Sequence, residues 1–185
     1  MRAIPYVRGA AAAAAVAGTA IAIPASAHVT LESSEAVAGS YHKVVLRIPH
    51  GCSGAATTAV RVQIPDGVVD VRPQPKPGWA VDTVIETLDE PVDAGHGNMV
   101  TETVREVHWT DGHLLDAHYD EFAMRVRLPD APDTVLHFPA VQVCEEGVHR
   151  WIEIPEEGRS AHDYDEPAPA LRLINSGGNG HSHGD

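Results

Sequence analysis

The sequence predicts an all-β fold, an antiparallel β-sandwich, and three observations support this expectation. Short runs rich in Val, Ile, Leu and Thr alternate with polar residues, so that each run can bury one face against a core. Pro and Gly separate the runs at the spacing typical of strands joined by turns. Beyond residue 27, no stretch of useful length has the apolar period of a helix.

The first four expected strands follow from this alternation. Residues 41–48 place three aliphatic side chains on one face and end at a Pro-His-Gly turn. Residues 60–64 read VRVQI, with the polar residues between the apolar ones, and end at Pro-Asp-Gly. Residues 79–88 alternate after a turn-rich segment. Residues 99–109 alternate less regularly, with acids and threonines between the valines.

The remaining strands lie in the second half of the chain. Residues 122–128 have a regular apolar face of period two, and 135–143 and 148–154 complete the set. Because proline has no backbone N–H to donate, Pro139 predicts an edge strand or a bulge within the run that contains it. Residues 171–174 form a last apolar patch, which we expect to pack back onto the sandwich.

The N-terminus has the features of a secretory signal peptide. Arg2 and Arg8 form a basic region, and residues 9–23 are almost entirely Ala, Val and Ile. The small residues 25–27, Ala-Ser-Ala, then match the pattern read by a signal peptidase. Cleavage after this triplet would make His28 the first residue of an exported protein, either secreted or retained in the periplasm or at the cell surface.

We therefore expect three parts: a signal peptide at 1–27, a sandwich domain at 28–174 and a flexible Gly/Ser/His tail at 175–185. The formal net charge of −13 argues against nucleic acid or anionic lipid as a partner and suits a protein that attracts cations. No second apolar run approaches the roughly 20 residues that span a bilayer, and no cysteine follows the cleavage site to accept a lipid.

An N-terminal histidine can chelate a metal ion through two nitrogens, the freed α-amine and the imidazole Nδ1. Unperturbed pKa values of about 7.7–8.0 for an α-amine and 6.5 for imidazole let both donors lose their protons to a metal near neutrality. Paired nitrogen donors favour copper, which is at the top of the divalent affinity order and accepts tetragonal geometry. His28 is thus a candidate copper ligand, although some residue must follow every cleavage site.

Cys52 and Cys144 are the two cysteines of the chain. A pair of cysteines in an exported protein usually forms a disulfide. The alternative is a pair of thiolate copper ligands, but the neighbouring residues show no short metal-ligand spacing. A disulfide is the favoured interpretation.

Other histidines offer weaker candidates. His181 and His183 form a His-x-His motif in the tail, and His113 and His118 flank a polar loop that also contains aspartates. Each pair can be explained as surface residues, and each is kept as a possible additional metal site. No histidine has sequence neighbours that nominate it as a second ligand beside His28.

Several segments together resemble YcnI-type copper-binding domains, a family long described as a domain of unknown function. The resemblance covers about residues 28–174 and is distributed over the whole domain. The matching segments include 28–30 (HVT), Glu35, 38–40 (AGS), 47–52 (RIPHGC), 57–58 (TT), 62–65 (VQIP), 73–79 (PQPKPGW), 119–122 (YDEF) and 150–155 (RWIEIP).

This resemblance implies a fibronectin III- or cupredoxin-like sandwich that binds Cu(II) in a mono-histidine brace. The implied ligands are the amine and Nδ1 of His28 and the carboxylate of Glu35, with Trp151 beside the metal. From the residues alone, Glu32 is an equal rival of Glu35, and a Trp on a strand is most simply a core residue. A ring face near a cation can add attraction on the order of 1–2 kcal/mol.

The family also implies a role in copper acquisition, delivery or homeostasis, as a metallochaperone that works with a copper chaperone or a copper-transporting membrane protein. We expect no enzymatic activity. One alternative is a copper-dependent oxygenase, which would need a second histidine ligand. Another is a surface interaction module without a metal. Hydrolase motifs such as Gly-x-Ser-x-Gly and His-Glu-x-x-His do not occur.

Overall fold

The computed structural model describes residues 28–95 and 97–176. The expected signal peptide, His96 and most of the tail, with His181 and His183, lie outside the described residues. The described part is all-β except for one short 3₁₀ turn, η1 (Ala161–Asp163). In this part of the chain, no helix is long and apolar enough to cross a membrane.

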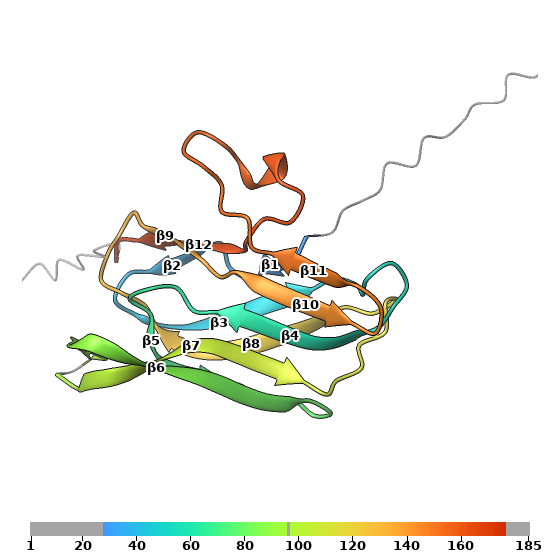
Figure 1. Ribbon diagram of the computed structural model, residues 1–185. Coiled ribbons are helices and arrows are strands. Elements are labelled where there is room, and N and C mark those ends of the chain that lie inside the picture. Colours follow the sequence, from blue (N-terminus) through green and yellow to red (C-terminus); the bar gives the residue numbers. More distant parts are fainter. Residues whose placement is uncertain (1–27, 96, 177–185) are drawn as a thin grey trace, which may run out of the picture.

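The described residues form twelve strands in three sheets (Figure 1). The first sheet has the order β1 (Thr30–Leu31), β3 (Tyr41–Ile48), β8 (Asp120–Arg127), β5 (Val69–Pro73). The second has the order β11 (Val148–Trp151), β10 (Ala140–Cys144), β4 (Thr57–Gln63), β7 (Met99–Thr110), β6 (Ala80–Asp93). The third has the order β2 (Glu35–Val37), β12 (Ala170–Ile174), β9 (Val135–His137).

The first two sheets pack face to face and form the predicted sandwich. The core contains apolar side chains from both sheets, and the alternation expected for 60–64 and 122–128 is confirmed. Val60, Val62 and Ile64 are buried while Arg61 and Gln63 are exposed. All strand pairs are antiparallel except β12 with β2. The third sheet contributes Leu136, Leu171 and Leu173 to the same core, so 171–174 packs back as expected.

The single strand expected at residues 135–143 is wrong. Residues 135–143 form two strands in different sheets, β9 and β10, because the chain changes sheet at Phe138-Pro139. Pro139 itself lies in neither strand but in the connection between β9, an edge strand, and β10, which lies between two neighbours. The expected strand 148–154 also ends earlier, at Trp151, and 79–88 continues as β6 to Asp93.

The segments 73–79 and 119–122 meet at one side of the sandwich. The ring of Trp79 packs edge-on against Phe122 with centroids 4.9 Å apart. Lys76 Nζ bonds Asp120 Oδ1 at 2.6 Å and the carbonyl of Glu121 at 3.1 Å. This contact ties the segment before β6 to the start of β8.

The predicted disulfide between Cys52 and Cys144 is confirmed. Their Cα atoms lie 6.0 Å apart, within the usual range for a disulfide. It links the turn before β4 to the end of β10, across a sequence separation of 92 residues. The bond therefore constrains a long loop of the unfolded chain.

Candidate functional site

His28 and Trp151 lie side by side, although they are far apart in the sequence. His28 lies two residues before β1, an edge strand of the first sheet, and Trp151 ends β11, an edge strand of the second. Their ring centroids are 5.8 Å apart, with the planes tilted by 58°. The candidate site therefore lies where two sheet edges meet on the same side of the sandwich.

Burial and a hydrogen bond to Gln142 hold the side chain of Trp151 in place. Its side chain is buried, with 3% exposed, and its ring N–H donates to Gln142 Oε1 at 3.2 Å. Gln142 is also buried, and its amide nitrogen donates to the His50 carbonyl at 2.7 Å and to Thr57 Oγ1 at 2.8 Å. A buried amide with both ends bonded fixes the ring that forms the wall of the site.

A second histidine packs against the same tryptophan. His149, two residues earlier on β11, has its ring centroid 5.2 Å from that of Trp151. His149 Nδ1 contacts Glu166 Oε1 at 2.6 Å, and the other carboxylate oxygen of Glu166 accepts the Arg150 backbone N–H at 2.8 Å. Glu166 thus anchors the end of a long loop to the strand that carries Trp151.

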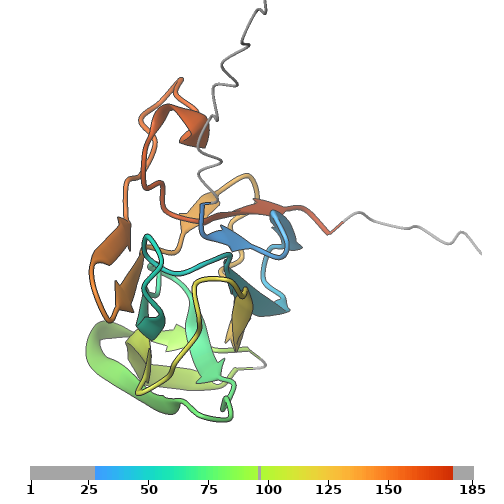
Figure 2. The ribbon, with the colours of Figure 1, turned by 90° about the vertical axis from the view of Figure 1, so that its right-hand side faces the viewer.

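This loop, residues 152–169 between β11 and β12, is called the cap loop here. It projects from the sandwich in both ribbon views, above β1, β11 and β12 in Figure 1 and at the upper end in Figure 2. Its two ends are joined by a bridge of Glu153 with Pro167 and by the Ala168 N–H bond to the Glu153 carbonyl at 2.8 Å. The ends are fixed while the tip, with η1, extends outward.

A cavity of about 320 Å³ lies between His28 and the cap loop. Its lining residues are His28, Val29, Thr30, Leu31, Ser34, Ala161, His162, Pro167, Ala168, Pro169 and Ala170. His28 is partly exposed and His162 is exposed, so both rings are within reach of solvent. Two histidines that are far apart in the sequence therefore line the same cavity.

The two candidate carboxylates lie in different surroundings. Glu35 begins β2 and is exposed, and in the strand register it is paired with Arg172 of β12. Its neighbour Ser34 lines the cavity with His28, whereas Glu35 does not. Glu32 is also exposed and forms an ion pair with Arg47, at 3.4 Å.

The remaining histidine candidates do not gather into a metal cluster. His113 Nδ1 lies 3.4 Å from Glu145 Oε1, and His118 is exposed without joining that pair. Within 28–95 and 97–176, no group of three or more His, Cys, Asp or Glu side chains is placed to hold a metal. A brace that uses a backbone amine needs fewer than three such side chains.

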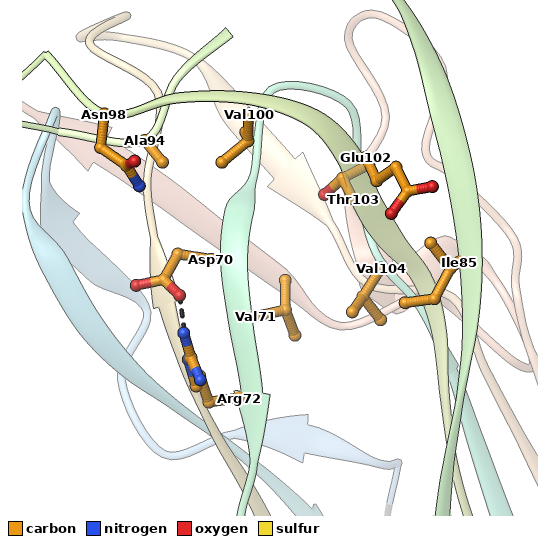
Figure 3. A pocket seen from close by; sticks show the side chains of 10 residues that line it. All are labelled: Asp70, Val71, Arg72, Ile85, Ala94, Asn98, Val100, Glu102, Thr103 and Val104. Atoms are coloured by element: carbon orange, nitrogen blue, oxygen red, sulfur yellow. Dashed lines mark hydrogen bonds and ion pairs between the residues drawn. The ribbon is translucent and has the colours of Figure 1, made fainter. Parts of the chain in front are cut away.

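A second cavity, of about 300 Å³, lies at the opposite edge of the sandwich, between β5 and the β6–β7 hairpin (Figure 3). Val71, Val104 and Ile85 line it, and Arg72 donates to Asp70 at 3.0 Å on its rim. None of its described lining residues is a histidine or cysteine. Its donors are poor ligands for copper, so the His28 edge is the candidate metal site.

The fold and this edge site define the chain as an immunoglobulin-like β-sandwich with a histidine and a tryptophan packed at one open edge. The chain belongs to the family described as "Domain of unknown function (DUF1775)", which matches residues 28–173. This match confirms the family suggested by the distributed motifs.

Two relatives show how far the similarity extends. A solved structure of an uncharacterized protein from Nocardia farcinica, described as an immunoglobulin-like fold, has 29% identity and a TM-score of 0.60. The match covers 80% of this chain and 99% of that one. The protein named Copper-binding protein CutI of Bacillus subtilis (strain 168) is 28% identical over 107 residues, 58% of this chain. The match spans 46% of that curated relative's length.

Proposed function

We propose that this protein is exported and binds one Cu(II) ion at the mature N-terminus, in copper acquisition, delivery or homeostasis. The proposed ligands are the freed amine and Nδ1 of His28, with the carboxylate of Glu35. The observation that carries the proposal is the position of His28, partly exposed and 5.8 Å from the buried ring of Trp151. The name of the Bacillus subtilis relative supports copper as the metal.

The residues at this edge fit the metal chemically. A chelate of amine and imidazole with one carboxylate is an N,N,O set, which suits Cu(II) and offsets part of its charge. The indole face beside His28 can attract a cation and exclude water from one side. The acidic character of the whole chain, with a net charge of −13, raises the local concentration of cations.

The first test is whether the amine of His28 is free and necessary. Intact mass of the exported protein should show a chain that begins at His28. A variant that retains Ala27 before it has an acylated nitrogen in place of the amine, so its tight Cu(II) binding should be lost. If that variant binds Cu(II) as tightly as the mature protein in a competition titration, the brace is wrong.

The second test assigns the carboxylate. Glu35→Gln keeps the shape and removes the charge, so affinity should fall and electron paramagnetic resonance should report a changed equatorial donor set. Glu32→Gln is the matched control, because Glu32 is also an exposed Glu near the N-terminus but is paired with Arg47. A changed spectrum for Glu32→Gln with an unchanged one for Glu35→Gln would transfer the role to Glu32.

The third test separates a carrier from an oxygenase. The proposed set contains no thiolate or thioether, the ligands that Cu(I) prefers. Reduction with ascorbate should therefore release the metal or pass it to a partner with softer ligands, such as a copper chaperone or transporter. Sustained peroxide production or polysaccharide cleavage by the reduced, copper-loaded protein would overturn this and favour the enzyme.

A further inference from the structure

The cavity at the edge of the sandwich opposite His28 has the features of a second ligand site (Figure 3). Its volume of about 300 Å³ is at the lower end of the range for small-molecule sites. Residues of β5, an edge strand of the first sheet, line one side, and residues of β6 and β7 line the other. A ligand in this cavity is therefore held between the edges of two sheets.

The inner part of this cavity is apolar. Val71 is 8% exposed and Val104 packs against the core, so both have fixed surroundings. Ile85 of β6 also lines the cavity and is 53% exposed. Figure 3 shows these three side chains on the same side of the β5 ribbon. An apolar group placed against them removes apolar surface from water, which favours binding.

A bulge in β5 shapes the polar rim of the cavity. The register of β5 with β8 shifts between Val69 and Arg72, and Asp70 within this shift has a φ of 47°. A positive φ costs a non-glycine residue free energy, and bulges often re-aim side chains beside binding sites. In this conformation Asp70 accepts bonds from Arg72 at 3.0 Å and from Arg125 at 2.7 Å. The strained residue therefore orients two guanidinium groups, of which Arg72 lines the cavity.

The charge at this rim is positive, because one carboxylate faces several cations. In the strand register Lys43 is opposite Arg125, and Arg125 is opposite Arg72. Like charges at directly opposed positions destabilise a sheet, and a bound anion relieves that repulsion. The Arg72 side chain is 71% exposed, and a guanidinium has five N–H donors in a geometry that matches a carboxylate. Arg72 can thus bond an anion while it keeps its bond to Asp70.

We propose that this cavity binds a small amphipathic carboxylate, with its apolar chain between the sheets and its carboxylate on Arg72. Because β5 is an edge strand, one ligand can pass over its open side and reach both the apolar part and the guanidinium. The net charge of −13 disfavours an extended polyanion. A small anion contacts only this rim, since charges beyond about 8 Å are largely screened at physiological ionic strength. The site is separate from His28 and does not depend on copper.

The probe is octanoate, titrated into isotope-labelled protein that begins at His28 and contains no metal. Amide chemical shifts report both the affinity and the location of binding. We expect saturable shifts at Val71, Ile85 and Val104. Octanol has the same chain without the charge, so it should bind about 10-fold more weakly, the loss expected for one charge-assisted contact.

Two matched pairs of variants test the two parts of the site. Arg72→Gln should weaken octanoate binding by about 10-fold. Arg61→Gln makes the same charge change at an exposed position of β4 outside this cavity and should leave the affinity unchanged. Ile85→Ser should weaken binding by about 5-fold through lost apolar contact. Val84→Ser is its control, because Val84 is 44% exposed and does not line this cavity.

Glu102 provides a test of opposite sign. It is the other acid among the described lining residues and is exposed, so Glu102→Gln should tighten octanoate binding by about 2-fold. Weaker binding by this variant would overturn the inference, as would an absence of saturable shifts, shifts confined to other regions, or equal affinities for octanol and octanoate. Equal effects within either matched pair would also overturn it, because net charge or general apolar contact would then explain the binding.

Discussion

Gln142 is the buried polar residue on which the position of Trp151 depends. We predict that Gln142→Met destabilises the domain substantially, although methionine has a similar size and is more apolar. The variant removes three hydrogen bonds, those to the Trp151 N–H, the Thr57 hydroxyl and the His50 carbonyl. Gln142 is 1% exposed, so water cannot replace these bonds.

The expected loss in the free energy of unfolding depends on which hydrogen-bond partners of Gln142 are buried away from water. Trp151 is 3% exposed, so its ring N–H loses its partner away from water. Thr57 is 0% exposed, and its hydroxyl keeps only a long contact with Cys144 Sγ at 3.7 Å. A buried polar group left unsatisfied costs about 1–3 kcal/mol. His50 is only half-buried and can turn to water. The extra apolar burial of methionine returns about 1 kcal/mol, so the net loss should be about 3 kcal/mol.

Urea unfolding of the purified domain measures this loss. Gln63→Met is the matched control, because Gln63 is an exposed glutamine at the end of β4 and should change stability by no more than about 0.5 kcal/mol. The near-ultraviolet circular dichroism of Gln142→Met should also change as the indole loosens. A loss below about 1 kcal/mol, with an unchanged urea slope, would refute the reasoning.

Three further predictions concern the rest of the sandwich. Replacing both Cys52 and Cys144 with alanine should lower the free energy of unfolding by about 4–5 kcal/mol, because the disulfide spans 92 residues, and equal urea midpoints would contradict this. Lys76→Met should cost about 1–2 kcal/mol by loss of its charge-assisted bonds, whereas thermal melts of Lys43→Met, at an exposed position, should match the wild type. Burial lowers the pKa of His137, so below its ordinary pKa of 6.5 the unfolded chain binds more protons and stability should fall as pH drops from 7. His137→Gln should reduce that slope, and a slope identical to the wild type would contradict the assignment.

The sequence was sufficient to predict a strand where one face of that strand is buried and the other is exposed to solvent. The run 122–128 alternates cleanly because β8 lies in the middle of the first sheet, with its inner face in the core. The sequence was insufficient to predict strands that are short or irregular. β1 and β2 have two and three residues, too few for a period, and in β5 the register shifts between Val69 and Arg72.

The change of sheet at Pro139 shows a different limit. Both halves of 135–143 have strand-like alternation, and a proline is compatible with an edge, a bulge or a break. The choice depends on which partners each half finds: β9 pairs with β12, and β10 pairs with β4 and β11. Those partners lie far away in the sequence, so local pattern cannot identify them.

The residues of the candidate site also divide into those that the sequence identified and those that it did not. His28 was found from the signal-peptide pattern and Trp151 from the family resemblance, and the structure places them together. The sequence did not single out His149, which packs on Trp151, or His162, which lines the cavity beside His28, because their positions depend on how β11 and the cap loop meet the N-terminus. The available signal was weak: a histidine two residues before the tryptophan, and another in an acidic segment that ends at a Pro-Ala-Pro sequence.

The two halves of the site differ in how firmly they are held, and this difference suits the proposed delivery of copper. Trp151 is bonded through Gln142 to Thr57, whose hydroxyl lies 3.7 Å from Cys144 Sγ of the disulfide. That wall cannot move without disrupting the core. His28 precedes β1 and is only partly buried, so it can change position at little cost to the core. A rigid wall would fix where the ion binds, and a ligand at the expected chain end would let it leave, which a site held entirely by core strands would not allow.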